Sequence, residues 1–240
     1  MPTKPAKRAL AEYARKRDFT KTSEPKGKPV RRAVAKRQLR FCIQKHLASH
    51  LHYDFRLEHE GVLLSWAIPK GPSLDSTVKR LAMKVEDHPL EYGKFEGVIP
   101  EGYGAGIVML WDQGTWRPEV ENVGEALEKG NLKFTVEGIK LKGSWVLVRS
   151  GGRGRNGDDR QWLLIKHRDE WSGELDITEA APLSVKSFGD FAEILADAKP
   201  KIWKTYKPQQ GGEAGRLMKE VVAKAVELRT AKAGRSRSLN

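Results

Sequence analysis

Residues 44–57 read QKHLASHLHYDFRL and contain three of the six histidines of the chain. The second half of this stretch alternates strictly between apolar and polar residues. Because side chains on a β-strand point to opposite faces in turn, an extended segment puts His52, Asp54 and Arg56 on one face and its apolar residues against a core. His46 is close enough upstream to reach the same point from a strand end. Imidazoles, a carboxylate and a guanidinium can together hold a divalent metal and an anionic oxygen, so the stretch predicts a metal-assisted phosphate site.

The same alternation is also typical of a solvated strand face, where polar side chains need no partner. Histidine is an unusual choice for a face that is merely wet, but spacing alone leaves both interpretations open. His50 shares the face of His52 only if the strand begins early. We therefore expect His50 to support the site from outside the ligand set.

The charge of the chain is concentrated at its two ends. The 240 residues carry a formal net charge of +13, of which residues 1–40 account for +11 and residues 199–240 for +8, so the middle is mildly acidic at −6. Basic ends give sequence-independent affinity for a polyanion, with a strong dependence on salt. A solubility tail and a membrane-surface patch are the alternatives. The N-terminal end shows no amphipathic apolar face, which favours nucleic acid.

The single cysteine, Cys42, excludes an internal disulfide and a thiolate-rich zinc site, and its apolar neighbours indicate a buried thiol. The longest apolar run, at 107–111, is far shorter than the ~18–20 residues that a membrane span needs. The first residues lack the hydrophobic stretch of a secretory signal. We expect a cytoplasmic, nucleoid-associated protein with no membrane partner.

Short β-type runs dominate residues 39–172, and turns rich in Gly, Pro and Asp separate them. The runs are 39–45, 51–58, 62–68, 81–86, 107–111, 115–117, 132–137, 144–149 and 161–167. A hairpin is expected at 59–61, one helix at 123–129 and a flexible loop at 150–159. Eight or nine short strands at this spacing predict a mainly β domain, either a small closed β-barrel of about eight strands or a sandwich.

The two ends are expected to be less compact than this domain. Residues 1–38 form a basic N-terminal arm, partly disordered, with a short helix at 10–17, and the arm is expected to be able to close over the site. Residues 173–240 form a basic C-terminal extension with one or two helices, at 188–198 and 216–232, and a linker between them.

Further polar residues lie where predicted strands begin or end. Lys70 follows the run 62–68, Arg80 precedes the run 81–86, and His88 stands between that run and a proline. Strand ends lie at the rim of a barrel, where binding residues are often placed. Each of these residues alone is more often structural than catalytic.

Taken together, these fragments resemble the phosphoesterase domain of bacterial and archaeal DNA ligase D, which heals 3′ ends in non-homologous end joining. The resemblance covers about residues 13–171 and rests, in order, on RDF at 17–19 with EP at 24–25, QKH at 44–46, SHLHYDFRL at 49–57, WAIPKGP at 66–72, EDHPLEY at 86–92, FEG at 95–97, IPEG at 99–102 and WLLIK at 162–166. It implies a small β-barrel with a polar active-site crater. It also implies one divalent metal, preferably Mn2+ with Zn2+ or Co2+ as alternatives. The implied activity removes a 3′-terminal ribonucleoside and then the remaining 3′-phosphate, which leaves a 3′-OH.

Carried over residue by residue, the resemblance implies that His46, His52 and Asp54 bind the metal. The other implied site residues are the phosphate contacts Arg56, His88, Tyr92 and Arg17, the supporting cations Arg80 and Lys70, and the acids Asp18 and Glu24 of the arm, which serve the diesterase step. His88, protonated near neutral pH, is our candidate for the general acid.

The chain departs from the family pattern in the glycine-rich stretch 98–106, which lacks one residue between Gly102 and Tyr103, so neither Glu101 nor Tyr103 is given a role. No Lys-x-Asp-Gly nucleotidyl-transfer motif occurs, so we expect a stand-alone phosphoesterase or a separately made domain. The expected partners are DNA or RNA–DNA 3′ ends on a primer–template, with a DNA ligase, a repair polymerase or a Ku-type end-binding protein as candidates in trans.

Two other functions are alternatives to this prediction. A non-catalytic module could bind DNA ends and recruit repair partners, but a degenerate module would be expected to have lost some of the implied site residues, and all are present. A zinc hydrolase acting on a small phosphate ester matches the basic ends poorly.

Overall fold

The computed structural model describes residues 9–27, 38–150, 159–198 and 212–237. The expected disordered start, most of the loop at 150–159 and most of the linker between the C-terminal helices lie outside these ranges.

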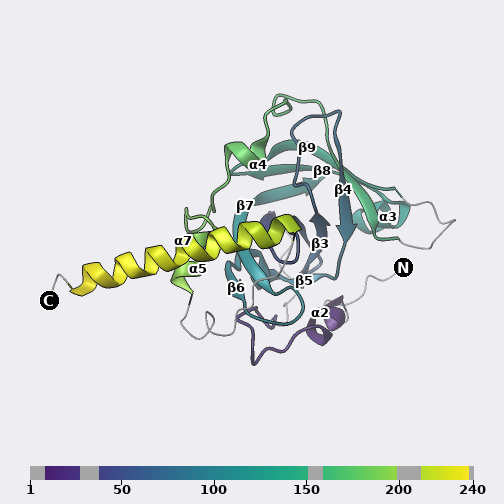
Figure 1. The fold of residues 1–240 in the computed structure, drawn as a ribbon. Coiled ribbons are helices and arrows are strands. Elements are labelled where there is room, and N and C mark those ends of the chain that lie inside the picture. Colours follow the sequence, from purple (N-terminus) through teal and green to yellow (C-terminus); the bar gives the residue numbers. More distant parts are fainter. Residues whose placement is uncertain (1–8, 28–37, 151–158, 199–211, 238–240) are drawn as a thin grey trace.

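Eight antiparallel strands close into a barrel (Figure 1). In order around the ring they are β1 (Leu39–Leu47), β2 (Leu51–His59), β3 (Val62–Ile68), β4 (Lys79–Lys84), β10 (Gln161–Lys166), β9 (Lys142–Arg149), β8 (Asn131–Gly138) and β7 (Gly106–Pro118). The pairing of β1 with β7 closes the ring. The prediction of a mainly β protein with a closed barrel of about eight strands is confirmed.

The strand β7 is one continuous element where the sequence predicts two. Residues 112–114 read as a turn, but Asp112 is fully buried. Its carboxylate accepts hydrogen bonds from the backbone N–H groups of residues 139–141, which form the next turn. Gly114 lies so close to β8 that a Cβ there would overlap the Glu137 carbonyl oxygen. The strand therefore continues through both residues: the Asp112 carboxylate caps a distant turn, and Gly114 lets the backbone of β8 come close.

Two short strands and a 3-10 helix, none of them predicted, cover part of the outer wall of the barrel. The strand β5 (His88–Pro89) pairs with β3, the 3-10 helix η1 (Leu90–Lys94) follows it, and β6 (Gly97–Ile99) pairs with β7. His88 was expected at a rim. It lies instead in a paired strand opposite Leu63 and is only 3% exposed.

The helices are α2 (Ala11–Arg15), α3 (Val123–Lys129), α4 (Ile177–Ala180), α5 (Phe191–Asp197) and α7 (Gly212–Arg237). The bounds of α3 agree with the prediction, because Asn122 caps its N-terminus and Gly130 ends it in a left-handed conformation. α5 begins later than predicted, after the capping box of Asp190. α4 was not predicted, and α7 is longer than predicted. It packs on α5 through buried Met218 and then extends away from the barrel (Figure 1). No helix in the described ranges is long and apolar enough to cross a membrane.

Large apolar side chains fill the interior of the barrel. The tryptophans at positions 66, 111, 145 and 162 are all at most 1% exposed, and Tyr53, Phe55 and Leu57 of β2 belong to the same core. The alternate residues of β2 therefore point out of the barrel. There they meet a second, smaller apolar cluster that includes Tyr13 and Tyr92. The site therefore lies on the outer wall of the barrel and not in its lumen.

Candidate active site

Three predicted ligands converge on the outer face of β1 and β2. His46 pairs with His52 across the two strands, and Asp54 follows two residues later on the same face. His46 Nδ1 lies 3.7 Å from Asp54 Oδ2, and His52 Nε2 lies 3.8 Å from Asp54 Oδ1. The register of the hairpin thus brings two imidazoles to one carboxylate.

The remaining nitrogen of each histidine ring is held by a backbone carbonyl. His46 Nε2 donates to the Gly104 carbonyl at 3.0 Å, and His52 Nδ1 donates to the His50 carbonyl at 2.9 Å. These bonds fix the tautomers, so that the lone pairs on His46 Nδ1 and His52 Nε2 face Asp54. Histidines that bind metals are commonly oriented in this way. His50 contributes through its backbone.

The donor set fits a divalent metal. Each of the three side chains offers one donor atom, and these atoms all lie within 4.8 Å of one another. Bonds of about 2.1 Å place two donors on one ion at most about 4.2 Å apart, so modest side-chain rotations complete the set. Two nitrogens and one oxygen suit Mn2+, Zn2+ or Co2+. In the described part of the chain this is the one group of three or more such side chains with this geometry.

Asp54 remains ionised although it is only 7% exposed. Burial alone would raise its pKa, but the Arg56 guanidinium and the two histidines outweigh burial and hold the pKa well below its usual range. Burial lowers the pKa of His52, which favours the neutral ring. An ionised Asp54 and a neutral His52 are the charge states that metal binding requires.

Arg56 connects His46, His52 and Asp54, the proposed metal-binding group, to the rest of the site. Its side chain is 2% exposed and uses all three nitrogens. Nη2 donates to Asp54 Oδ2 at 3.0 Å, Nε donates to Gln44 Oε1 at 2.8 Å, and Nη1 donates to Ser65 Oγ at 2.8 Å. Nη1 also lies 2.9 Å from His88 Nδ1. The guanidinium is therefore fixed in one orientation.

His88 lies between two arginines. Its Nδ1 is 2.9 Å from both Arg56 Nη1 and the Glu86 carbonyl oxygen, and its Nε2 is 3.2 Å from Arg17 Nη2. Burial, and then the charges of Arg56 and Arg17, lower the pKa of His88 well below its usual range. The lowered pKa favours the neutral ring, which argues against the expectation that His88 is protonated near neutral pH.

Two of the three predicted arm residues reach the site. Arg17 Nε donates to Glu24 Oε1 at 2.9 Å, Arg17 Nη1 donates to Glu86 Oε1 at 3.1 Å, and both carboxylates are buried. The Arg17 guanidinium also stacks 3.8 Å above the ring of Tyr13. Asp18 is exposed and accepts hydrogen bonds from Thr20.

Tyr92 is 2% exposed, its ring centroid lies 4.7 Å from that of His88, and the Arg56 guanidinium carbon lies 4.9 Å from its ring. Burial raises its pKa well above the usual range, so the phenol keeps its proton. Lys70 is exposed after β3. Arg80 lies near Asp176, whose pKa is lowered chiefly by the hydrogen bond from the Thr178 hydroxyl and to a smaller extent by the charge of Arg80. Among the contacts that the described residues make, none joins Lys70 or Arg80 to the metal-binding group.

Sequence reasoning missed three polar residues of the site: Gln44, Ser65 and Glu86. Gln44 is fully buried, and its Nε2 donates to the carbonyls of Tyr92 and Phe95, which ties η1 to the barrel wall. The period of two that selects Asp54 and Arg56 also puts Gln44 on the face of His46, so that signal was present. Ser65 and Glu86 depend on how β3 and the arm pack, which no local pattern shows.

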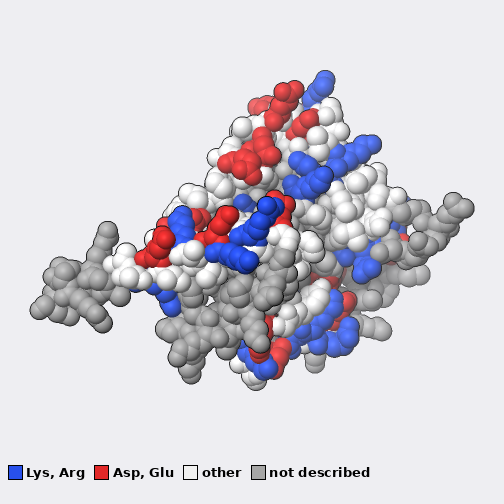
Figure 2. All heavy atoms as spheres, in the orientation of Figure 1, with Lys and Arg blue, Asp and Glu red and all other residues white. Residues whose placement is uncertain are grey.

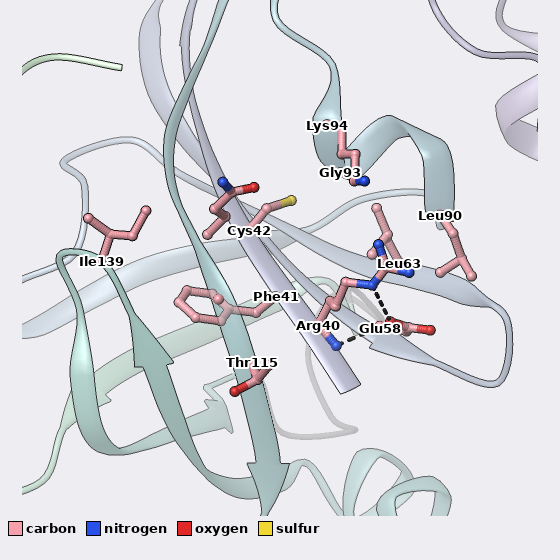
Figure 3. Close-up of a pocket in the computed structure, with 12 residues that line it drawn as sticks. Arg40, Phe41, Cys42, Glu58, Leu63, Leu90, Gly93, Lys94, Thr115 and Ile139 are labelled. Carbon is pink, nitrogen blue, oxygen red and sulfur yellow. Dashed lines mark hydrogen bonds and ion pairs between the residues drawn. The ribbon is translucent and has the colours of Figure 1, made fainter. Parts of the chain in front are cut away.

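A separate cavity of about 360 Å³ lies along the same face of β1 (Figure 3). In the sequence of β1, Gln44 stands between Cys42, which lines this cavity, and the candidate ligand His46. Buried Cys42 and Leu63 and half-buried Leu90 line the cavity, and at one end Glu58 Oε2 accepts from the Arg40 backbone N–H at 3.1 Å. The expectation of a buried thiol is confirmed. None of the predicted site residues lines this cavity.

The fold and site define a closed antiparallel β-barrel protein with a candidate divalent-metal site beside buried cations. Residues 44–149 match the family model of the DNA ligase D 3′-phosphoesterase domain. The chain is 54% identical over 173 residues to the multifunctional non-homologous end joining protein LigD of Pseudomonas aeruginosa, which covers 72% of this chain and 20% of that protein. It is also 43% identical over 162 residues to LigD of Mycobacterium bovis, and this match covers 67% of this chain and 20% of that protein. The matched residues form a domain of the DNA ligase D 3′-phosphoesterase family, which confirms the resemblance. The chain spans about a fifth of the length of these relatives.

Proposed function

We propose that this chain is a metal-dependent 3′-phosphoesterase of DNA end repair. Its substrates are DNA or RNA–DNA 3′ ends on a primer–template. It removes a 3′-terminal ribonucleoside and then the 3′-phosphate left behind, and the resulting 3′-OH is ready for ligation in non-homologous end joining. We place this activity in the cytoplasm at nucleoid DNA, with a ligase, a repair polymerase or a Ku-type protein as the partner.

One observation carries the proposal. The free nitrogens of His46 and His52 face Asp54, and the Asp54 carboxylate accepts a hydrogen bond from Arg56. A metal-binding group and a fixed phosphate-binding guanidinium are thus adjacent on one hairpin. When bound, the metal, preferably Mn2+, supplies a Lewis acid that polarises a phosphoryl oxygen.

The buried cations are suited to bind and orient the phosphate. Arg56 lies against one ring nitrogen of His88 and Arg17 against the other. Two guanidinium groups this close together attract an anion. Tyr92 keeps its phenolic proton and can donate it in a hydrogen bond to a phosphate oxygen. These donors are held in place before substrate arrives, so they stabilise the negative charge that develops in the transition state of phosphoryl transfer.

His88 remains our candidate for the general acid, with its proton acquired on substrate binding. A phosphate dianion placed between the two arginines would offset their charge and raise the pKa of His88. The ring could then protonate the departing oxygen. In the arm, Glu24 orients Arg17, and exposed Asp18 is available to the terminal nucleoside. Lys70 and Arg80 act as supporting cations toward the substrate strand.

Release of phosphate from a 3′-phosphorylated oligonucleotide tests the proposal. We expect His52→Ala, Asp54→Ala and Arg56→Ala each to abolish Mn2+-dependent release while circular dichroism shows an intact barrel. His59→Ala, at the other end of β2, is the matched control and should keep activity. Because Arg56 is buried, Arg56→Gln serves as a second variant if the alanine variant fails to fold. Full activity in any of the three site variants would sink the proposal.

A further inference from the structure

We propose that a pocket beside the site binds the 3′-terminal nucleoside that departs in the diesterase step, with Tyr103 as the surface on which its base stacks. The inference rests on the proposed function and deepens it, because it concerns the part of the substrate that the monoesterase step lacks. Neither the family pattern nor the sequence analysis gives Tyr103 a role.

The pocket begins where the candidate phosphate site ends. Its volume is about 370 Å³, and its two walls are residues of the arm between Lys16 and Glu24 and residues 101–103 of the glycine-rich loop. Arg17 lines it and also lies 3.2 Å from His88 Nε2. The loop wall is connected to the metal-binding group through the Gly104 carbonyl, which accepts from His46. A group leaving the phosphate on this side would enter the pocket directly.

The charges of the pocket favour an uncharged occupant. Its cations are already paired with carboxylates, in the ion pairs Lys16–Glu86 at 3.0 Å, Arg17–Glu24 at 2.9 Å and Lys21–Glu101 at 2.9 Å. Asp18 adds another carboxylate to the lining. Such a lining offers no excess positive charge to a second phosphate. The upstream strand carries a phosphate at every nucleotide, whereas the terminal nucleoside carries none beyond the scissile one.

Tyr103 supplies an aromatic face at this position. Its side chain is 51% exposed, and the Lys16 ammonium lies over the ring at 4.6 Å from the centroid. Gly102 and Gly104 on either side adopt φ angles of +87° and +76°, a conformation that favours glycine and that turns the loop at this residue. Every nucleobase has a π-face, so stacking on tyrosine tolerates any base. The carboxylate of Asp18 and the hydroxyl of Thr22 are acceptors suited to ribose hydroxyls.

The test compares two substrates, a primer ending in one ribonucleoside and the same primer ending in a 3′-phosphate. We expect Tyr103→Ala to lower kcat/KM on the ribonucleoside end by about 5- to 150-fold more than on the phosphate end, as loss of a stacked base predicts. Tyr103→Phe keeps the ring and should restore the ratio. Trp171→Ala is the matched control, because Trp171 is also an exposed aromatic residue with a lysine over its ring.

A third substrate, ending in an abasic ribose, isolates the base. On this end we expect Tyr103→Ala and the unchanged protein to react at the same rate. An equal loss on the ribonucleoside and phosphate ends would overturn the inference, since it would mean that Tyr103 acts through the loop on His46. No loss on either end in Tyr103→Ala would overturn it as well. If the unchanged protein processes neither end with any metal, the proposed function fails, and this inference fails with it.

Discussion

His88 depends on two residues that are distant in the sequence. Arg17 lies 71 positions before it and Arg56 32 positions before it, and each faces one of its ring nitrogens. The position of the histidine beside a proline gave no sign of this arrangement. Sequence therefore predicts that His88 belongs to the site but not its protonation state, because the charges that set its pKa arrive through tertiary packing.

The depressed pKa of His88 makes folding stability depend on pH. In the unfolded chain a histidine gains its proton at about pH 6.5. In the folded protein burial, Arg56 and Arg17 keep the ring of His88 neutral well below that pH. The unfolded state then binds more protons, so stability is fully present above about pH 6.5 and falls as the pH drops, by up to about 1.4 kcal/mol per pH unit.

We expect His88→Gln to reduce this pH dependence. Urea unfolding of both proteins at pH 7 and pH 5, with EDTA present, measures it. Asp54 has its own depressed pKa in both proteins, as do His52 and His59, so the difference between the two slopes isolates His88. Identical slopes would show that His88 is protonated in the folded state.

Metal affinity is a second property set by single residues. His52→Ala removes one of the three proposed ligands and should weaken Mn2+ binding by at least about 100-fold, since even partners outside the ligand set contribute about 10- to 100-fold. Isothermal titration calorimetry measures the affinity. His59→Ala, on the same strand, should bind Mn2+ as the unchanged protein does. Equal affinities in both variants would place the metal elsewhere.

The alternation in residues 51–57 was sufficient to predict which residues of β2 share a face. It could not show that this face lies outside the barrel. That outcome follows from the tryptophans of other strands, which fill the lumen, and from the arm and η1, which cover the outer wall. Gln44 was missed although its spacing is regular, because an amide between an isoleucine and a lysine gives no chemical signal of its own.

At the scale of elements, the sequence predicted those helices and turns whose ends are set by neighbouring residues. α3 has both an N-cap and a C-terminal glycine, and its predicted bounds are confirmed. The hairpin between β2 and β3 turns at Glu60 and Gly61, which both have positive φ angles, as predicted. β5 and β6 contain two and three residues and exist only because β3 and β7 offer them partners, so no sequence pattern marks them.

The junction of β1 and β7 couples the barrel to the metal-binding group. A Cβ on Gly106 would overlap the Leu47 carbonyl oxygen and lie 3.0 Å from His46 Nε2. We expect Gly106→Ala to lower the free energy of unfolding by about 1–3 kcal/mol and also to weaken Mn2+ binding, because His46 must move.

Gly114→Ala is the matched control for this junction. Gly114 lies on the same strand β7, away from His46, and a Cβ there would overlap the Glu137 carbonyl oxygen of β8. It should therefore lower stability to a similar extent but leave Mn2+ affinity intact. Urea unfolding and calorimetry measure the two properties separately. Intact Mn2+ binding in Gly106→Ala would contradict the coupling.

At the scale of the whole molecule, charge is distributed in patches. Figure 2 shows Lys and Arg side chains over β4 and Asp and Glu side chains over α4, so this face of the described structure has no single sign. The two ends of the sequence, residues 1–40 and 199–240, together carry +19, which exceeds the net charge of +13 because the middle is acidic. The salt dependence of the affinity for substrate measures how much these ends contribute to binding.

We expect affinity for a primer–template to fall steeply with salt, with a slope of about −0.9 per phosphate contact in a plot of log K against log salt. Residues 1–8 contain three cations and no acid. Their deletion should flatten the slope by up to about 2.7, whereas deletion of the uncharged residues 238–240 should not change it. Fluorescence anisotropy over a salt series gives the slopes. Equal slopes would exclude residues 1–8 from contact with the substrate.

The central claim is tested most directly by a gel assay on a 5′-labelled primer–template that ends in one ribonucleotide, incubated with Mn2+, Mg2+, Zn2+ or EDTA. The account predicts stepwise conversion to a 3′-phosphate and then to a 3′-OH, with metal only. No conversion with any metal, together with a salt-sensitive shift of the substrate, would contradict it and identify a non-catalytic module that binds DNA ends.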